Sequence, residues 1–384
     1  ALYTKHLKEI GQEFVLSEYG QSLLEAEKNK PKYELPKTGR QSENYFDLRE
    51  EALSYRIYGG NYIEQGALDQ MQTAMKLPIS VAGALMPDAH QGYGLPIGGV
   101  LATTANTVIP YAVGVDIACR MCMSVFDLPV LMIQREDKLL KKMLEYHSFF
   151  GMGSESKQKY DDTLFDRSEW TATKLIRDLK DKAYRQLGTS GTGNHFVEWG
   201  VLEVLEQDEL MDLPVGKYLT LLSHSGSRGF GGAIANHYSG IAMEKTRLPK
   251  EAKHLAWLDM SSDEGQEYWL SMNLAGDYAS ANHHEIHNKI AAALNQNPLK
   301  RIENHHNFAW KELINGEEVI VHRKGATPAG KGVMGIIPGS MTAPGFLVRG
   351  KGETSAINSA SHGAGRLMSR TKAIQSISKS DMKA

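Results

Sequence analysis

The sequence predicts an α+β protein, and three observations favour that class. Apolar residues recur at three- and four-residue steps over four stretches, which predicts helices at 61–76, 136–149, 169–187 and 262–293. Short apolar runs punctuated by Gly and Pro fill residues 85–127 and 319–349, which predicts short strands joined by tight loops. Strands and helices do not alternate at the spacing of βαβ units, so a doubly wound parallel sheet is not expected.

The first strand-rich stretch contains both cysteines of the chain, Cys119 and Cys122. Their spacing matches a redox motif, but residues three apart in a strand face opposite ways, so a dithiol switch is not expected. We interpret Cys122 as a core residue, as free cysteines usually are. Two cysteines cannot form a disulfide framework, which favours a reducing cytoplasm.

The last predicted helix carries His283 and His287, whose spacing could hold a metal ion. Glu285 does not complete the His-Glu-x-x-His pattern of zinc-dependent proteases. We therefore interpret the two histidines as part of a solvated helix face.

Composition and charge limit the classes of partner. The 384 residues carry a formal net charge of −2, which argues against a protein that coats nucleic acid nonspecifically. Residues 323–372 nevertheless hold eight Lys or Arg and one acid, Glu353, so a phosphate-bearing partner is expected there.

No stretch has the length and apolarity of a membrane span, and no membrane partner is expected. Without repeats or linkers, residues 1–384 are expected to form one domain.

Five short polar clusters, most of them rich in glycine, are expected to lie in loops at strand ends. They are residues 114–119, which follow the Asp88 and His90 run, and residues 191–198, 223–229, 304–307 and 358–366. Each cluster alone is weak evidence, because a histidine beside glycine is usually structural. Together they offer one Asp, one Cys and several His, the ligands of a site for one or two divalent ions, without identifying the metal.

These clusters, in this order, resemble the RtcB family of RNA-splicing ligases from about Ser54 to the end of the chain. The resemblance rests on the runs MPDAHQGYG (86–94), VGVDIAC (113–119), GNHF (193–196), HSGSRG (224–229), HHN (305–307), RKGA (323–326), IIPGSM (336–341) and SHGAGRLMSRTKA (361–373). It implies a single RtcB-like catalytic domain with a mixed or antiparallel β core, surrounding helices, and a metal site in loops at strand ends.

The resemblance also implies a reaction. A GTP- and manganese-dependent ligase would join RNA ends that bear a 3′-phosphate or 2′,3′-cyclic phosphate to 5′-hydroxyl ends, in tRNA splicing or RNA repair. The reaction would pass through a GMP-histidine and an RNA-pp-G intermediate. The partners would be tRNA halves or other cleaved RNAs and, as in some relatives, an accessory activator protein; a monomer is the default expectation.

The same resemblance assigns roles to residues. Cys119 would bridge two Mn²⁺ ions, with Asp116 and His195 on one ion and His224 and His306 on the other. His362 would attack GTP and carry GMP, and Arg228 would act with it as a contact to RNA phosphates, although an arginine that locks a loop is an alternative. The GMP pocket would comprise Asn194, His195, Phe196, Val197, Glu198, His306, Asn307, Pro338, Gly339, Ser340, Met341, Gly345, His362, Gly363, Ala364 and Gly365.

Physical chemistry supports the nucleophile. Neutral imidazole is a competent nucleophile near pH 7, and the small residues around His362 leave room for a nucleotide. Glu198 could accept hydrogen bonds from the guanine edge and so select G over A.

Two departures from the family pattern put parts of the pocket in doubt. Many relatives have Ser where this chain has Gly345, so one nucleotide contact could be lost or come from backbone. The family domain is expected to continue past Ala384 with a Tyr-Lys-Asp segment and a lysine that helps to hold guanine.

Two other functions stay open at this point. A metal-dependent RNA phosphoesterase or cyclic-phosphate hydrolase would keep the metal ligands but would not need His362. A non-catalytic protein that senses RNA ends would need neither a nucleotide-accepting histidine nor a thiolate between metals.

Overall fold

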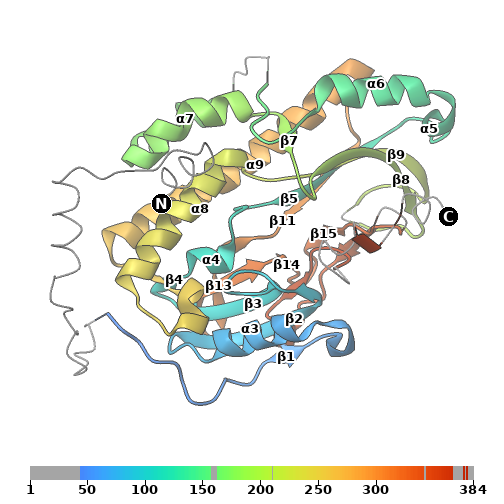
Figure 1. Cartoon of the computed structure of the whole chain (residues 1–384). Coiled ribbons are helices and arrows are strands. Elements are labelled where there is room, and N and C mark those ends of the chain that lie inside the picture. The colour runs from blue at the N-terminus through green and yellow to red at the C-terminus, as the bar shows by residue number, and fades with distance from the viewer. Residues whose placement is uncertain are drawn as a thin grey trace, which may run out of the picture. The chain divides into compact units, whose positions relative to one another are not determined.

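Two larger β-sheets with helices packed beside them form the part of the chain described by the computed structural model (Figure 1). It describes residues 44–156, 162–209, 211–340, 343–365, 375–376 and 378. The protein is α+β, with mixed and antiparallel sheets, as predicted. Residues Asn44–Ala384 group into one compact unit by their contacts. That the whole of 1–384 is one domain stays a prediction, because residues 1–43 lie outside the described part.

The first sheet has the strand order β1-β2-β3-β13-β12. Its strands are β1 (Arg56–Ile57), β2 (Ser80–His90), β3 (Ile97–Thr104), β13 (Glu317–Lys324) and β12 (Phe308–Ile314). The short β1 pairs with β2 in parallel, and the other pairs are antiparallel. Helix α3 (Gln65–Met75) covers this sheet with the buried side chains of Met71 and Met75, which join the same apolar core as Leu85 and Leu101.

The second sheet, in the order β11-β5-β9-β8, is antiparallel throughout. Its strands are β11 (Lys300–His305), β5 (Arg120–Phe126), β9 (Gly216–Ser225) and β8 (Phe196–Val204). Side chains alternate between its faces. Met121 and Met123 pack in one core with Ile336, whereas Phe126 packs in another with Ile286 of the long helix α9.

Helices α7 (Lys174–Gln186), α8 (Arg228–Lys245) and α9 (Asp263–Leu294) share one apolar core, in which Phe230 and Tyr278 are buried (Figure 1). Ser262 caps α9 by accepting a hydrogen bond from the Gly265 amide, and Asn295 ends the helix in a left-handed conformation. None of the helices in the described ranges combines the length and apolarity that crossing a membrane requires.

Shorter elements connect these parts. The helical ones are η1 (Gly60–Tyr62), α4 (Pro110–Val113), α5 (Met132–Arg135), α6 (Asp137–His147), η2 (Thr163–Asp166), η3 (Ser168–Thr171), η4 (Lys250–Leu255) and η5 (Thr354–Ala356). The strands are β4 (Thr107–Val108), β6 (Phe149–Phe150), β7 (Thr189–Gly191), β10 (Leu258–Asp259), β14 (Ala326–Pro328), β15 (Met334–Ile337), β16 (Phe346–Arg349) and β17 (Ser359–Ser361).

The four predicted helices are confirmed as α3, α6, α7 and α9, with ends that differ by a few residues. Helix α8 was not predicted, because its first residues, Arg-Gly-Phe-Gly-Gly, have the composition of a loop. Strands occur in both stretches where they were expected, in β2 to β5 and in β13 to β16.

One interpretation of the sequence was wrong. His283 and His287 do not lie on a solvated face, because both are fully buried between α9 and the second sheet. Helix α9 is enclosed over much of its circumference, so periodicity alone could not identify its solvated side.

Candidate metal and nucleotide site

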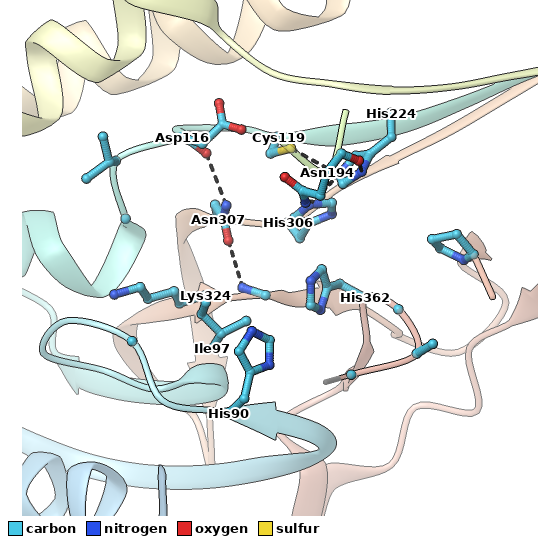
Figure 2. Close-up of a pocket in the computed structure, with 18 of the residues that line it drawn as sticks. His90, Ile97, Asp116, Cys119, Asn194, His224, His306, Asn307, Lys324 and His362 are labelled. Atoms are coloured by element: carbon cyan, nitrogen blue, oxygen red, sulfur yellow. Dashed lines mark hydrogen bonds between the residues drawn. The ribbon is translucent and has the colours of Figure 1, made fainter. Parts of the chain in front are cut away.

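Polar clusters far apart in the sequence meet where strands of the two sheets end. The first residue of β5, Arg120, pairs with the last residues of both β9 and β11. This register places three side chains that flank those ends next to one another: Cys119, His224 and His306 (Figure 2). They line one wall of a cavity of about 540 Å³. Such a volume suits a small-molecule ligand.

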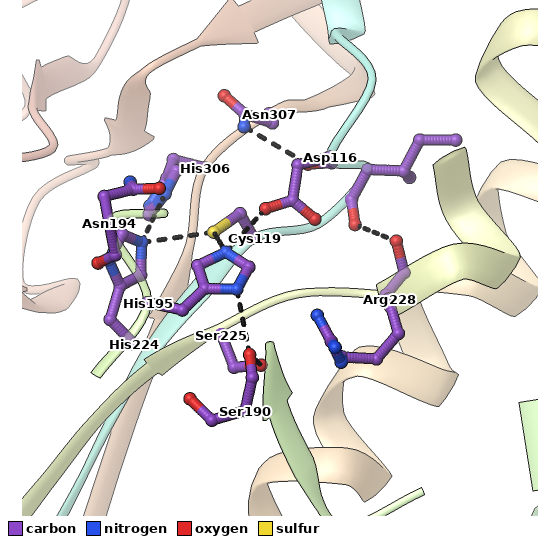
Figure 3. A network of polar contacts seen from close by, with 12 residues as sticks. Asp116, Cys119, Ser190, Asn194, His195, His224, Ser225, Arg228, His306 and Asn307 are labelled. Atoms are coloured by element: carbon purple, nitrogen blue, oxygen red, sulfur yellow. Dashed lines mark hydrogen bonds and ion pairs between the residues drawn. The ribbon is translucent and has the colours of Figure 1, made fainter. Parts of the chain in front are cut away.

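The candidate metal ligands form a continuous chain of close contacts (Figure 3). The Cys119 Sγ atom lies 3.1 Å from His224 Nε2 and 3.5 Å from His195 Nε2. The Nε2 atoms of His224 and His306 are 3.2 Å apart, and His195 Nε2 is 2.8 Å from Asp116 Oδ2. All five side chains that the sequence assigned to metal therefore gather around the one sulfur atom.

The outer nitrogens of two of these histidines are held by backbone. His195 Nδ1 lies 2.9 Å from the Ser190 carbonyl oxygen, and His224 Nδ1 lies 3.0 Å from the Asn194 carbonyl oxygen. A carbonyl can only accept, so each Nδ1 carries a hydrogen, and each Nε2 presents a lone pair to the cluster whenever its ring is neutral. Metal-binding histidines are commonly oriented in this way.

Burial controls the charge of the cluster. It lowers the pKa of His224 to about 3, and it lowers the pKa of His306 well below the usual range. Burial, together with the charge of Asp116, raises the pKa of the Cys119 thiol. Burial alone would raise the pKa of Asp116, but the hydrogen bond and charge of His195 outweigh it and lower that pKa. Neutral imidazoles, a carboxylate and a thiol that a cation could ionise are a donor set that fits divalent metal ions.

The loop that carries Asp116 is fixed from several directions. Ala118 adopts a left-handed conformation with φ 55°, and Asn307 donates a hydrogen bond of 3.2 Å to the Asp116 carbonyl oxygen. The Asn307 side chain also accepts a hydrogen bond from the Gly325 amide at 2.7 Å, which links the two walls of the cavity. Gly226 lies so close that a Cβ atom there would be 2.1 Å from Asp116 Oδ1. The carboxylate thus has little freedom to move.

His362 lies on the wall of the cavity opposite Cys119 (Figure 2), in the loop that follows β17. Its ring centroid is 4.9 Å from that of His306. Asp88, at the end of β2, places its Oδ2 atom 2.7 Å from His362 Nδ1, and the same oxygen accepts hydrogen bonds from the amides of His362 and Gly363 at 3.2 Å. The acceptor fixes the hydrogen on Nδ1 and leaves the lone pair on Nε2.

Asp88 was given no role by the sequence, although it belongs to a run quoted for the family resemblance. Its side chain is buried, with 3% exposed. A carboxylate near His362 in the sequence could have signalled such a partner. Asp88, however, lies 274 positions before His362. Only tertiary structure shows such a contact.

Most residues of the predicted GMP pocket line the cavity. Those that do are Asn194, Phe196, His306, Asn307, Pro338, Gly339, Ser340, His362, Gly363, Ala364 and Gly365. His195 belongs to the Cys119 cluster, and Val197 packs in the core with Phe126. Glu198 lies on the same strand face as Phe196, one alternation further along β8.

Two predicted pocket residues remain. Gly345 packs against the backbone of the lining segment, and a Cβ atom there would be 3.1 Å from the Ile337 carbonyl oxygen. Met341 lies outside the described residues.

Two basic residues show different environments. The Arg228 Nε atom donates to Thr189 Oγ1 at 3.0 Å, and the guanidinium covers Gly191, where a Cβ atom would be 1.9 Å from Nη1. These contacts support the loop-locking alternative for Arg228 without excluding a contact to RNA.

Lys324, which was not singled out as a site residue, lines the cavity and donates to the carbonyl oxygens of Tyr93 and Tyr111. Burial lowers the pKa of Lys324 to about 7.

Comparison with known proteins supports the family that the motifs indicate. A sequence profile of the family described as "tRNA-splicing ligase RtcB" matches residues 70–384. An Escherichia coli protein named "RNA-splicing ligase RtcB1" is 33% identical over 361 residues, which cover 86% of this chain and 85% of that protein. A Thermococcus kodakarensis protein named "tRNA-splicing ligase RtcB" is 29% identical over an alignment of 416 positions, gaps included. The alignment covers 90% of this chain and 84% of the relative.

Proposed function

The chain belongs to the RtcB family of tRNA-splicing ligases, and from this premise we propose that it joins RNA ends through a GMP-histidine at His362. The substrates would be an RNA end with a 3′-phosphate or 2′,3′-cyclic phosphate and an RNA end with a 5′-hydroxyl. One observation carries the proposal. Asp88 binds Nδ1 of His362 and so leaves Nε2 unprotonated, and the His362 ring lines the same cavity as the Cys119 cluster.

The contacts support the metal ligands that the family resemblance implies. Asp116 and His195 would hold one Mn²⁺ ion and His224 and His306 a second, and Cys119 would serve as a ligand to both. The ions would neutralise negative charge that develops on phosphate oxygens. The backbone carbonyls that hold His195 and His224 keep their Nε2 lone pairs directed at the ions.

His362 performs the first chemical step. Its Nε2 lone pair attacks the α-phosphorus of GTP, a P–N bond forms, and the bond to pyrophosphate breaks. Asp88 holds the proton on Nδ1 and stabilises the positive charge that the ring acquires. An ordinary hydrolase does not need a histidine held in this tautomer, which favours the ligase over the phosphoesterase alternative.

The remaining steps transfer GMP. An oxygen of the RNA 3′-phosphate attacks the same phosphorus, the P–N bond breaks, and RNA-pp-G forms. The 5′-hydroxyl then attacks the RNA phosphate, a phosphodiester forms, and GMP leaves. A 2′,3′-cyclic phosphate must first be opened by water.

Contacts to guanine and RNA belong to the proposal as well. Glu198 would accept hydrogen bonds from the guanine edge, with the lining residues of the predicted GMP pocket around the nucleotide. Arg228 would contact RNA phosphates by its guanidinium, in addition to its bond to Thr189. We further propose that the protein acts as a monomer in the cytoplasm, with an accessory activator in some reactions.

The test is incubation with GTP labelled at the α-phosphorus and Mn²⁺, followed by denaturing electrophoresis. We expect acid-labile label on the protein, from GTP but not from ATP, and no label on His362→Ala. His237→Ala, which changes an exposed histidine of α8, serves as the matched control and should keep the label. An unlabelled protein that still hydrolyses cyclic phosphates would support the phosphoesterase instead.

A further inference from the structure

A second group of potential metal ligands lies on the other side of the second sheet from the site described above. Cys122 of β5 and Ser223 of β9 are directly opposite each other in the antiparallel ladder. Both face α9, where His283 and His287 point back at them. All four side chains are fully buried. Ser223 and His224 are successive strand residues and so point to opposite faces of the sheet, which separates this group from the candidate active site.

The donor atoms converge. One sulfur atom and one nitrogen from each histidine all lie within 4.8 Å of one another. Zinc bonds thiolate sulfur at about 2.3 Å and imidazole nitrogen at about 2.0 Å, so ligands of one ion lie roughly 3 to 4 Å apart. His283 and His287 are one helical turn apart and present their rings on the same face, a spacing that suits two ligands of one ion. Small side-chain movements would therefore complete a three-ligand site.

We propose that Cys122, His283 and His287 bind a zinc-type divalent ion that fastens helix α9 to the second sheet. A thiolate and two imidazoles form a borderline-soft donor set, which selects zinc or cobalt rather than the magnesium class. The Ser223 Oγ atom, within 2.6 Å of His283 Nδ1 and 2.8 Å of His287 Nε2, is placed to supply an oxygen at the fourth position.

The hydrogen bonds around the group suit a metal site. His287 Nδ1 is 2.8 Å from Ser124 Oγ, which can hold the hydrogen on Nδ1 and leave Nε2 as a donor of electrons. His283 Nδ1, which is 2.6 Å from Ser223 Oγ, is the ring nitrogen that faces the group.

Ion binding would change the charge of this fully buried group, because the Cys122 thiol must lose its proton to act as a ligand. Binding would release the thiol proton and leave a net charge of about +1 at the site. Charges of both signs lie near Cys122: Glu303, its cross-strand partner on β11, is paired with Arg120 at 2.9 Å, and Arg301 is also close.

The test exploits the small number of cysteines. In Cys119→Ser, Cys122 is the one cysteine left of the two in the chain. The reduced protein is treated with chelator, reloaded with Co²⁺ or Zn²⁺, and measured for thiolate-to-cobalt charge-transfer absorption and for zinc by mass spectrometry. We expect the charge-transfer band in Cys119→Ser. In Cys119→Ser/Cys122→Ser we expect no band, and one equivalent less of bound zinc per protein molecule.

Controls keep the result decisive. Cys122→Ser is nearly isosteric, and circular dichroism checks that each variant is folded; Cys119→Ser/His287→Gln provides a second variant that should lose the band. Cys119→Ser/His237→Ala should keep it. A folded Cys119→Ser protein without the band, or a double variant that binds as much zinc as Cys119→Ser, would overturn the proposal. Neither readout depends on ligase activity, so the result is independent of the proposed function.

Discussion

At the scale of single residues, the contact between Asp88 and His362 decides which nitrogen of the histidine can react. The carboxylate accepts from Nδ1 and from two backbone amides, so it fixes both the tautomer and the loop that carries the ring. An amide side chain in its place could donate to Nδ1 and move the hydrogen to Nε2. The nucleophile would then be blocked while the side chain keeps its size.

Asp88→Asn should therefore slow the labelling of the protein by GTP by about 10²- to 10⁴-fold, the range for a misdirected catalytic histidine. The measurement is the initial rate of label incorporation, with Mn²⁺ binding followed in parallel and expected to persist. Asp181→Asn, on the exposed face of α7, is the control of matched chemistry. Labelling of Asp88→Asn at the wild-type rate would contradict a tautomer-fixing role.

Lys324 gives a prediction about pH. Its pKa is lowered by burial to about 7, whereas an unfolded lysine titrates near 10.4. Between these values the unfolded chain binds one proton more, so the free energy of unfolding should rise with pH by up to about 1.4 kcal/mol per unit. This contribution is complete above the unfolded pKa and is lost as pH falls to about 7.

Lys324→Met should remove that slope. Urea unfolding of both proteins at about pH 7, 8 and 9 measures it, and the stability advantage of the variant should shrink as pH rises. Parallel stability curves would mean that the buried lysine keeps its proton, for example by its bonds to the Tyr93 and Tyr111 carbonyls.

At the scale of elements, the connection from β9 to α8 constrains the position of Asp116, a candidate metal ligand. Gly226 lies between His224 and the start of the helix, and no side chain fits there because of Asp116. Gly226→Ala should displace the carboxylate and weaken Mn²⁺ binding and GTP labelling together. Calorimetric titration with Mn²⁺ measures the first effect, and an unchanged affinity would show that Asp116 can move without loss.

Gly240→Ala is the matched control for that substitution. Gly240 lies within α8, and a Cβ atom there would meet nothing within 4 Å. Alanine in a helix interior is favoured over glycine, so we expect a gain of about 0.5–1 kcal/mol in stability with activity unchanged.

At the scale of the whole molecule, the candidate metal site joins parts of the chain that are otherwise separate. Its ligands come from the loop before β5, the loop before β8, the end of β9 and the residue after β11. Ions held by these ligands would bind the folded state only, and each ion at about 100 times its Kd would add about 2.7 kcal/mol to stability.

Mn²⁺ added to chelator-treated protein should accordingly raise the midpoint of thermal unfolding, and Cys119→Ser should lose most of the rise. Differential scanning calorimetry with and without Mn²⁺ makes the comparison. An equal rise in Cys119→Ser would place the stabilising ion elsewhere.

The sequence by itself determined the fold class and the helices with clear periodicity, and its resemblance to a known family supplied a set of candidate metal ligands. Asp116, Cys119, His195, His224 and His306 could be named as candidates because they lie in short local motifs that resemble those of the RtcB family. That they gather around one sulfur atom was an expectation, and the strand register of the second sheet brings it about.

Tertiary structure alone decided the remaining features. The pairing of Asp88 with His362, the burial of Lys324 and the enclosure of His283 and His287 all depend on which segments pack together. A helical or strand period reports only the geometry of its own element, whereas burial and pairing are set by neighbours that lie 60 or more positions away in these examples. For that reason the solvated face expected for α9 was wrong, and a second candidate metal site became visible only in the folded chain.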